Sequence, residues 1–285
     1  MTRSAGKSEA LRLDGAQPVV ADALDASAVN DAVVGARPDV VVHQLTAIPA
    51  RLNVRRIDRD FALTNRLLTE GTDHLIAAAR AAGARRFVVQ SFTGWPYARE
   101  GGPVKDEDDP LDPSPPARLA PILEAIRHHE AAVLGAEGLE GVVLRYGALY
   151  GPGTSFSDDG TVTQDVHRRR FPLVGDAGGV WSFVHVEDAA GATVAAVERG
   201  APGIYNVVDD DPATVAEWLP ALAAAMGAKR PRRVPAFVGR LAVGEHGVVM
   251  MTDVRGASNA KARRDLGWEP LHPSWREGFK DALGP

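Results

Sequence analysis

The chain has 285 residues, a net charge of −5 at pH 7, 45% hydrophobic residues, 24% charged residues and no cysteine. These values are typical of a globular protein with a large core, and they give no reason to expect a nucleic acid or an anionic membrane as partner. The lack of cysteine excludes disulfides, thiolate metal sites and a cysteine nucleophile. No apolar run approaches about eighteen residues, and the amino terminus lacks the apolar core of a secretory signal, so we expect a cytoplasmic protein.

Strand-like and helix-like segments alternate along the chain. Strands are predicted at residues 18–22, 39–44, 86–91, 142–145, 181–186 and 203–208. Helices are predicted at residues 8–14, 28–35, 61–82, 117–134, 187–199 and 214–226, with a short one ending at Leu266. The proline-rich residues 101–116 are predicted to form a surface loop. This alternation predicts an α/β fold whose parallel sheet is connected by right-handed crossovers.

The segment 142–153 is a short β-branched strand that runs into the turn Gly151-Pro152-Gly153. In open α/β sheets, ligands bind at the carboxyl ends of the strands. We therefore interpret this segment as the transition from a nucleotide-binding part to a substrate-binding part.

Six short motifs connect the sequence to a known family. They are Asp22 after its strand, residues 42–47, residues 87–91, Leu144-Arg145 with residues 150–153, residues 183–188, and residues 258–261 with residues 266–268. In this order and spacing the chain resembles the extended short-chain dehydrogenase/reductases, the NAD-dependent epimerase/dehydratase family, over nearly its whole length.

The resemblance implies a Rossmann-like doubly wound parallel sheet with a smaller C-terminal α/β substrate domain. The dinucleotide-binding region would comprise residues 1–153, completed by residues 181–208, and the substrate-binding region residues 154–180 and 209–285. It also implies NAD or NADP as cofactor, a small-molecule substrate and a homodimer. The family's reaction is hydride transfer at a hydroxyl or carbonyl carbon, here of a small polar, sugar-like substrate.

The resemblance assigns cofactor-binding roles residue by residue. Asp22, followed by Ala23, would hold the adenine ring, and Ser91 would lie beside the cofactor. Backbone groups of Leu45, Thr46 and Ala47 would line it. Arg3, Ser4 and Lys7 would lie at the adenine ribose, where an arginine favours NADP because a guanidinium pairs with a 2′-phosphate. The alternative for these last three residues is a solvated, frayed terminus.

One departure from the family concerns the pyrophosphate. The family opens with a strand and a Gly-x-x-Gly-x-x-Gly turn, and no segment of this sequence matches it. We therefore expect an N-terminally incomplete sheet, with a gap between the strands at Val19 and Val40 and unpaired apolar edges. The hypothesis that follows is that about thirty residues lie upstream of Met1, roughly one βαβ unit. The alternative is a fragment or a degenerate relative.

The other departure is catalytic. Family members carry Tyr-x-x-x-Lys, in which the tyrosine is the general acid/base. Counting back from Glu130 places Ile122 and Ile126 at these two positions, and neither can transfer a proton. The candidates that remain are Ser91, Thr93, Tyr97 and Tyr146 for catalysis, and Trp95 and His185 for substrate binding. Each tyrosine could equally be a packed rim residue, Ser91 could cap a turn, and His185 could be structural.

Other polar clusters have simpler interpretations. Glu124, His128, His129 and Glu130 lack metal-ligand spacing, so we expect a solvated helix face and no metal site. The basic runs 168–170 and 229–233 could bind a phosphate or be charged surface loops.

Two alternatives stay open at this point. The apolar helix pairs Leu67–Leu75 and Ile122–Ile126 could form a dimer seam or belong to the core. The alternatives to an enzyme are a non-catalytic binding or regulatory protein with this fold, and a truncated, inactive product.

Overall fold

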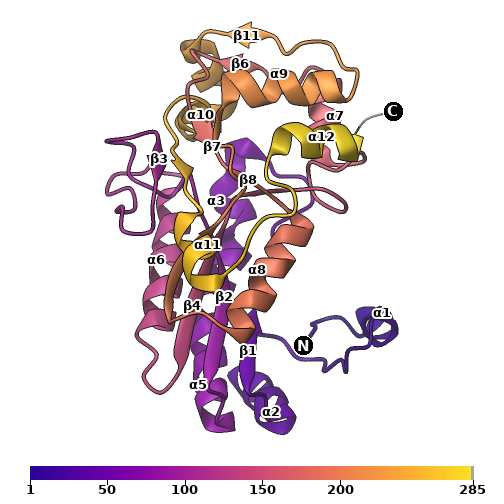
Figure 1. Ribbon diagram of the computed structural model, residues 1–285, viewed down its shortest axis with the longest axis vertical. Helices are drawn as coiled ribbons and strands as arrows, with labels where there is room; N and C mark the ends of the chain where they lie inside the picture. Colours follow the sequence, from indigo (N-terminus) through magenta and orange to yellow (C-terminus); the bar gives the residue numbers. More distant parts are fainter. Residues whose placement is uncertain (284–285) are drawn as a thin grey trace.

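The computed structural model describes residues 1–283 of the chain (Figure 1). Its main sheet has the strand order β1-β2-β4-β9, and all neighbouring strands are parallel. The strands are β1 (Val40–His43), β2 (Arg86–Phe92), β4 (Glu140–Tyr146) and β9 (Gly203–Val207). The predicted α/β fold with a parallel sheet is therefore confirmed.

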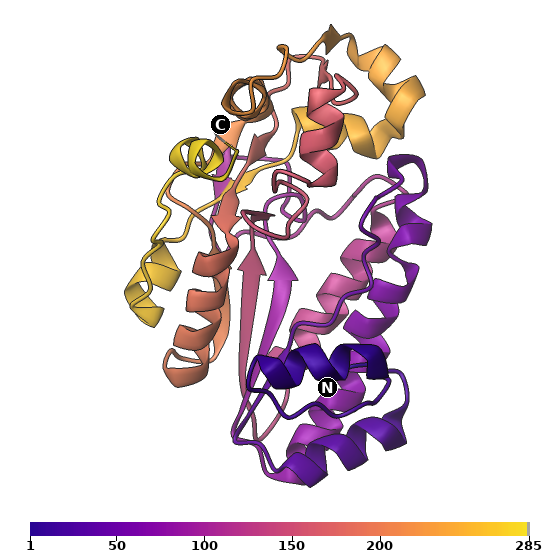
Figure 2. The same ribbon diagram turned by 90° about the vertical axis from the view of Figure 1, so that its right-hand side faces the viewer.

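Helices cover both faces of this sheet (Figure 2). On one face lie α2 (Ala26–Ala36), α5 (Thr72–Ala82) and α6 (Ala120–Leu134), and on the other lie α8 (Val186–Glu198) and α11 (Ala260–Leu266). Successive strand residues point to opposite faces. Val143 therefore packs among residues of α2 and α5, whereas Val142 and Leu144 pack against α8 and α11. Burial on both faces explains the continuous apolar runs of β2 and β4.

The helix predicted at residues 61–82 is present and contains one π-helical turn. It consists of α4 (Ala62–Arg66), the π-helix η3 (Leu67–Gly71) and α5, with helical backbone angles at both junctions. Nε2 of the buried His43 donates to the Leu67 carbonyl at 3.3 Å. The π-turn thus fixes the end of β1 against this helix.

A second hydrophobic core lies beyond the carboxyl ends of the strands. It joins aromatic residues that include Phe156, Phe183, Trp218, Trp275 and Phe279. The helices around it are α7 (Thr161–His167), α9 (Val215–Ala225), α10 (Ala236–Thr252) and α12 (Trp275–Leu283). Short two-stranded pairs complete this end of the molecule: β5 (Ala148–Tyr150) with β8 (Phe183–His185), β6 (Leu173–Val174) with β11 (Arg233–Val234), and β7 (Val180–Trp181) with β10 (Ala213–Thr214).

The predicted strand at residues 18–22 is wrong as a strand of the main sheet. Only an isolated parallel bridge joins Thr2 to Val20, and Val20 is 54% exposed. No strand of the described residues pairs with the outer edge of β1, where Val42 is 41% exposed. β1 is therefore an edge strand and not buried on both faces. In Figure 1 the first turns, η1 (Ala5–Lys7) and α1 (Ser8–Leu13), lie to one side of the sheet.

Smaller differences concern loops and interfaces. The predicted loop at 101–116 contains β3 (Val104–Lys105), which pairs with β12 (Gly256–Ala257), and the loop after β1 contains η2 (Val54–Arg56) and α3 (Ile57–Asp60). Leu67, Leu75, Ile122 and Ile126 are all at most 9% exposed within one chain. They belong to the core, so they form no dimer seam. None of the helices in the described part of the chain is long and apolar enough to cross a membrane.

Candidate active site

Three strand ends meet above the sheet. Gln44 follows β1, Thr93 follows β2 and Tyr146 ends β4. The Gln44 side-chain amide donates to the Tyr146 phenol at 3.2 Å, and the Thr93 backbone N–H donates to the Tyr146 carbonyl at 3.1 Å. These bonds bring together the carboxyl ends of three neighbouring parallel strands, which is where open α/β folds bind ligands.

A cavity of about 110 Å³ opens beside these strand ends. It is lined by Phe92, Thr93, Gly94, Trp95, Tyr146, Gly147, Ala148, Val180, Trp181, Ser182, Met250 and Val254. Apart from the Tyr146 phenol, none of these side chains can ionise, and four are aromatic. The Trp181 indole donates to the Met250 carbonyl at 2.9 Å, which fixes that ring in the wall.

Gly147 allows the cavity wall to form. A Cβ atom at this position would lie 2.7 Å from the Ser182 carbonyl oxygen, closer than any side chain tolerates. The absence of a side chain lets the end of β4 approach residues 182–183, and the Ala148 N–H donates to the Ser182 carbonyl at 2.9 Å.

The hydroxyl of Tyr146 has two hydrogen-bond partners, Gln44 and Thr193. The Tyr146 and Thr193 hydroxyl oxygens lie 2.6 Å apart, and the Thr193 hydroxyl donates its single proton to the Ala189 carbonyl at 2.8 Å. With the Thr193 proton on the Ala189 carbonyl, the Tyr146 phenol donates to Thr193 and its oxygen accepts from Gln44. Burial raises the pKa of Tyr146 above its ordinary value. The phenol is held neutral, with its proton directed away from the cavity.

Ser91 and Tyr97 belong to a buried network outside the cavity lining. The Ser91 hydroxyl donates to Glu130 at 2.6 Å. Arg145 binds the same carboxylate through two bonds of 2.9 and 2.6 Å and donates to the Tyr97 phenol at 3.0 Å. Tyr97 in turn donates to the Asn206 side-chain oxygen at 2.8 Å, and burial raises its pKa. The structure thus brings only Thr93 and Tyr146 of the four catalytic candidates to the cavity.

Glu124, His128, His129 and Glu130 are predicted to form a solvated face of helix α6. This prediction is wrong for His129 and Glu130. His129 is completely buried between Thr72 and the Gln90 carbonyl, and Glu130 is 4% exposed. Burial lowers the pKa of His129 to about 4, so this ring is neutral at pH 7. Single-sequence periodicity could not detect this, because the partners come from α5 and β2. On the same helix Ile122 and Ile126 pack in the core, where the family's tyrosine and lysine would lie.

The proposed dinucleotide-binding residues lie in two groups. Leu45, Thr46 and Ala47 follow β1, and Ala47 is held by its N–H bond to the Thr64 hydroxyl at 3.0 Å. Asp22 caps its own turn by accepting the Leu24 N–H at 3.0 Å with one oxygen.

The N-terminal residues lie near Asp22. The bridge from Thr2 to Val20 places Arg3 and Ser4 next to residues 21–22, and both are exposed, as is Lys7. Asp22 and residues 45–47 after β1 are the groups that would hold a dinucleotide. No glycine-rich turn for the pyrophosphate occurs among residues 1–283.

The other substrate-binding candidates differ in position. Trp95 lines the cavity. His185 does not: it ends β8, packs its ring against Tyr150 at 5.1 Å and accepts the Glu187 N–H at the start of α8. Burial, with the neighbouring His272, lowers the pKa of His185. The two basic runs meet through a bond from Arg169 to the Arg230 carbonyl at 3.3 Å.

A doubly covered parallel sheet with a ligand cavity at its strand ends is the architecture of nucleotide-dependent α/β enzymes. The profile of the NAD dependent epimerase/dehydratase family matches residues 1–207. The chain belongs to this family, and its cofactor is NAD or NADP.

Comparison with individual proteins gives a more specific relationship. The chain is 49% identical over 267 residues to a protein of Streptomyces sp. described as 3-diazoavenalumate denitrifying reductase, covering 92% of this chain and 85% of the relative. Among solved structures it is similar to the UDP-glucose 4-epimerase of Thermus thermophilus in complex with NAD, with a TM-score of 0.67, 26% identity and coverage of 92% and 82%. The dTDP-glucose 4,6-dehydratase DesIV of Streptomyces venezuelae, at 20% identity, shares the fold with a TM-score of 0.73 and coverage of 99% and 84%.

Proposed function

We propose that this protein is an NAD(P)H-dependent reductase that replaces the diazo group of an aromatic substrate with hydrogen. The bound dihydronicotinamide supplies a hydride. The substrate carbon that carries the diazonium group gains this hydride, its bond to nitrogen breaks, and the bonding pair leaves with neutral N2. The carbon is reduced by two electrons while the cofactor is oxidised by two, and the positive charge passes from substrate to cofactor. No proton enters or leaves.

The observation that carries the proposal is the commitment of the Tyr146 proton to Thr193. Reduction of a carbonyl needs a proton for the developing alkoxide, and counting back from Glu130 places the buried Ile122 and Ile126 where the family's tyrosine and lysine would lie. Loss of N2 needs no acid. The relative that is 49% identical carries a diazo compound and loss of nitrogen in its name, which supports the same chemistry here.

The cavity supports an aromatic diazonium substrate. Aliphatic diazonium ions lose N2 spontaneously, whereas aromatic ones persist long enough to be substrates. The walls include the rings of Phe92, Trp95 and Trp181 and hold no fixed positive charge. Aromatic faces attract a cation, so these rings would bind and orient a flat, positively charged arene.

The residues around the cavity would position the substrate and exclude water. The indole bond to the Met250 carbonyl holds Trp181 in one orientation, and the bond from Gln44 holds the Tyr146 ring. Thr93 donates its hydroxyl proton to Asn206 at 2.9 Å, so it offers no free proton to the cavity. An uncharged wall also protects the diazonium carbon from attack by water.

A carbonyl substrate, such as a sugar-like compound, is the second candidate. The phenol of Tyr146 in the cavity wall favours it, since this hydroxyl could donate if it released Thr193. The two candidates differ in their need for a proton from the protein or solvent.

Isotopic labelling separates them. The purified protein is incubated with an arenediazonium ion that carries no hydroxyl group and with NAD(P)H carrying two deuterium atoms at C4, and the reaction is repeated with unlabelled cofactor in D2O. We expect N2 release, one deuterium at the former diazo carbon in the first reaction, and none in the second. No product above the enzyme-free control, or carbon-bound deuterium from D2O, would contradict the proposal.

A further inference from the structure

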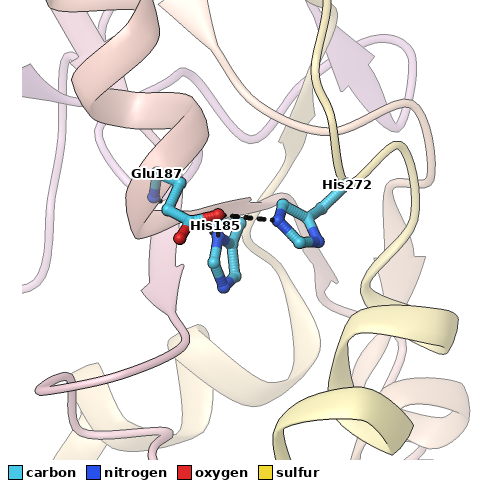
Figure 3. A group of neighbouring side chains, drawn as sticks. All are labelled: His185, Glu187 and His272. Carbon is cyan, nitrogen blue, oxygen red and sulfur yellow. Dashed lines mark hydrogen bonds and ion pairs between the residues drawn. The ribbon is translucent and has the colours of Figure 1, made fainter.

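Three potential metal ligands meet outside the cavity, where α8 begins and the segment before α12 passes. Figure 3 shows His185, Glu187 and His272 with their polar atoms facing one another. A Glu187 carboxylate oxygen lies 3.2 Å from Nε2 of His272 and 3.8 Å from Nδ1 of His185. The three ligand atoms all lie within 4.8 Å of one another, and the two imidazole rings have centroids 3.8 Å apart.

The backbone holds both histidines in place without an ion. The backbone N–H groups of His272 and Leu271 donate to the Asp188 carboxylate, at 3.0 Å and 2.6 Å respectively. His185 is 6% exposed and packs over Gly151, where a Cβ atom would lie 2.4 Å from Nε2 of the ring. Nε2 is thus enclosed, and Nδ1 faces Glu187 and His272.

We propose that Nδ1 of His185, the Glu187 carboxylate and Nε2 of His272 bind a divalent transition-metal ion of the Zn2+ type. Two imidazoles and one carboxylate are a ligand set typical of such ions. A tetrahedral ion with ligands at about 2.0–2.1 Å separates its ligand atoms by about 3.3 Å, close to the two distances to Glu187. The ion would replace the long, 3.3 Å bond from the Glu187 N–H to His185.

The site lies between two parts of the fold. It would tie the start of α8, which packs on the main sheet, to the segment that leads into α12 and the second core. Glu187 has a side chain that is 66% exposed, so a water molecule can complete the coordination.

Metal titration of tag-free, metal-free protein tests the proposal. We expect calorimetry with Zn2+ to give one equivalent bound, and Co2+ to develop the visible absorption of a tetrahedral site. Glu187→Gln and His272→Ala should each weaken Zn2+ binding at least about tenfold, the scale seen even for groups that only support metal ligands. The matched control is His128→Ala. His128 lies on α6, and its Nε2 atom lies 2.9 Å from the Asp73 carboxylate. This variant should bind Zn2+ as the parent does.

Thermal melts give an independent readout. Zn2+ should raise the melting midpoint of the parent and of His128→Ala, and raise that of His272→Ala by less at the same Zn2+ concentration, while all variants melt cooperatively without metal. Glu187→Gln, at an exposed position, keeps the test valid if His272→Ala fails to fold. The proposal is overturned if the parent binds no Zn2+, or if Glu187→Gln binds it as tightly as the parent.

Discussion

Arg145 and Glu130 form a bidentate ion pair inside the protein, with bonds of 2.9 and 2.6 Å and side chains that are 4% and 6% exposed. The Ser91 hydroxyl donates to the same carboxylate. This pair joins β4 to α6 and holds Tyr97 through Arg145, so two of the four catalytic candidates serve the interior of the fold.

Removing the charge of Glu130 should therefore destabilise the protein strongly. Glu130→Gln leaves the buried guanidinium uncompensated, a change that costs about 3–5 kcal/mol of unfolding free energy. Urea unfolding monitored by circular dichroism measures it. The control is Glu124→Gln on the same helix, where the side chain is 79% exposed, and it should stay within about 0.5 kcal/mol of the parent. A loss below about 1 kcal/mol for Glu130→Gln would contradict the structural role.

Asp209 should make stability depend on pH. Burial raises its pKa to about 8 from an ordinary value of 3.8, and it accepts the Trp275 N–H at 2.8 Å. The folded state therefore keeps a proton that the unfolded state has released, so this contribution is complete below about pH 4 and is lost as the pH rises towards 8.

Asp209→Asn, which mimics the protonated acid, should gain stability relative to the parent as the pH rises. The gain should reach about 1 kcal/mol per pH unit between about pH 5 and 7. Urea titrations at several pH values across this range give the difference. If the difference in unfolding free energy between Asp209→Asn and the parent does not change with pH, Asp209 has the same pKa in the folded and unfolded states.

The NADP preference proposed for Arg3 has a simple test. A guanidinium bonded to the 2′-phosphate contributes about 1.5–3 kcal/mol, so Arg3→Ala should weaken NADP binding at least about tenfold. NAD lacks this phosphate and serves as the internal control, with unchanged affinity. Thermal shift titrations with both dinucleotides measure the effect. Equal weakening of NAD and NADP, or no change in either, would remove Arg3 from the proposed ribose site.

Long, regular elements could be predicted from the sequence, whereas features that depend on distant partners could not. Four of the predicted strands form the main sheet because each is apolar enough to pack against the helices that cover it. The segment at 18–22 is also apolar, but a strand needs neighbours, and among residues 1–283 only Thr2 pairs with it.

The residues of the cavity could likewise be predicted only in part from the sequence. Thr93, Trp95 and Tyr146 follow strand ends and could be predicted as cavity residues, but the opposite wall comes from residues 180–182, Met250 and Val254, which share no motif. Tyr97 and Tyr146 are equivalent in sequence terms. Only the structure distinguishes them: Tyr97 is bonded to Arg145 and Asn206 in the interior, whereas Tyr146 lines the cavity.

The central claim is that reduction proceeds without a proton from Tyr146, and the most direct measurement is kcat for Tyr146→Phe with an arenediazonium substrate and NAD(P)H. This substitution keeps the ring in the cavity wall and removes only the hydroxyl. A proton donor contributes about 10²–10⁴-fold to the rate. We predict that kcat, corrected for the enzyme-free reaction, stays within about tenfold of the parent. A loss of about a hundredfold or more would show that Tyr146 supplies a proton and would favour the carbonyl substrate instead.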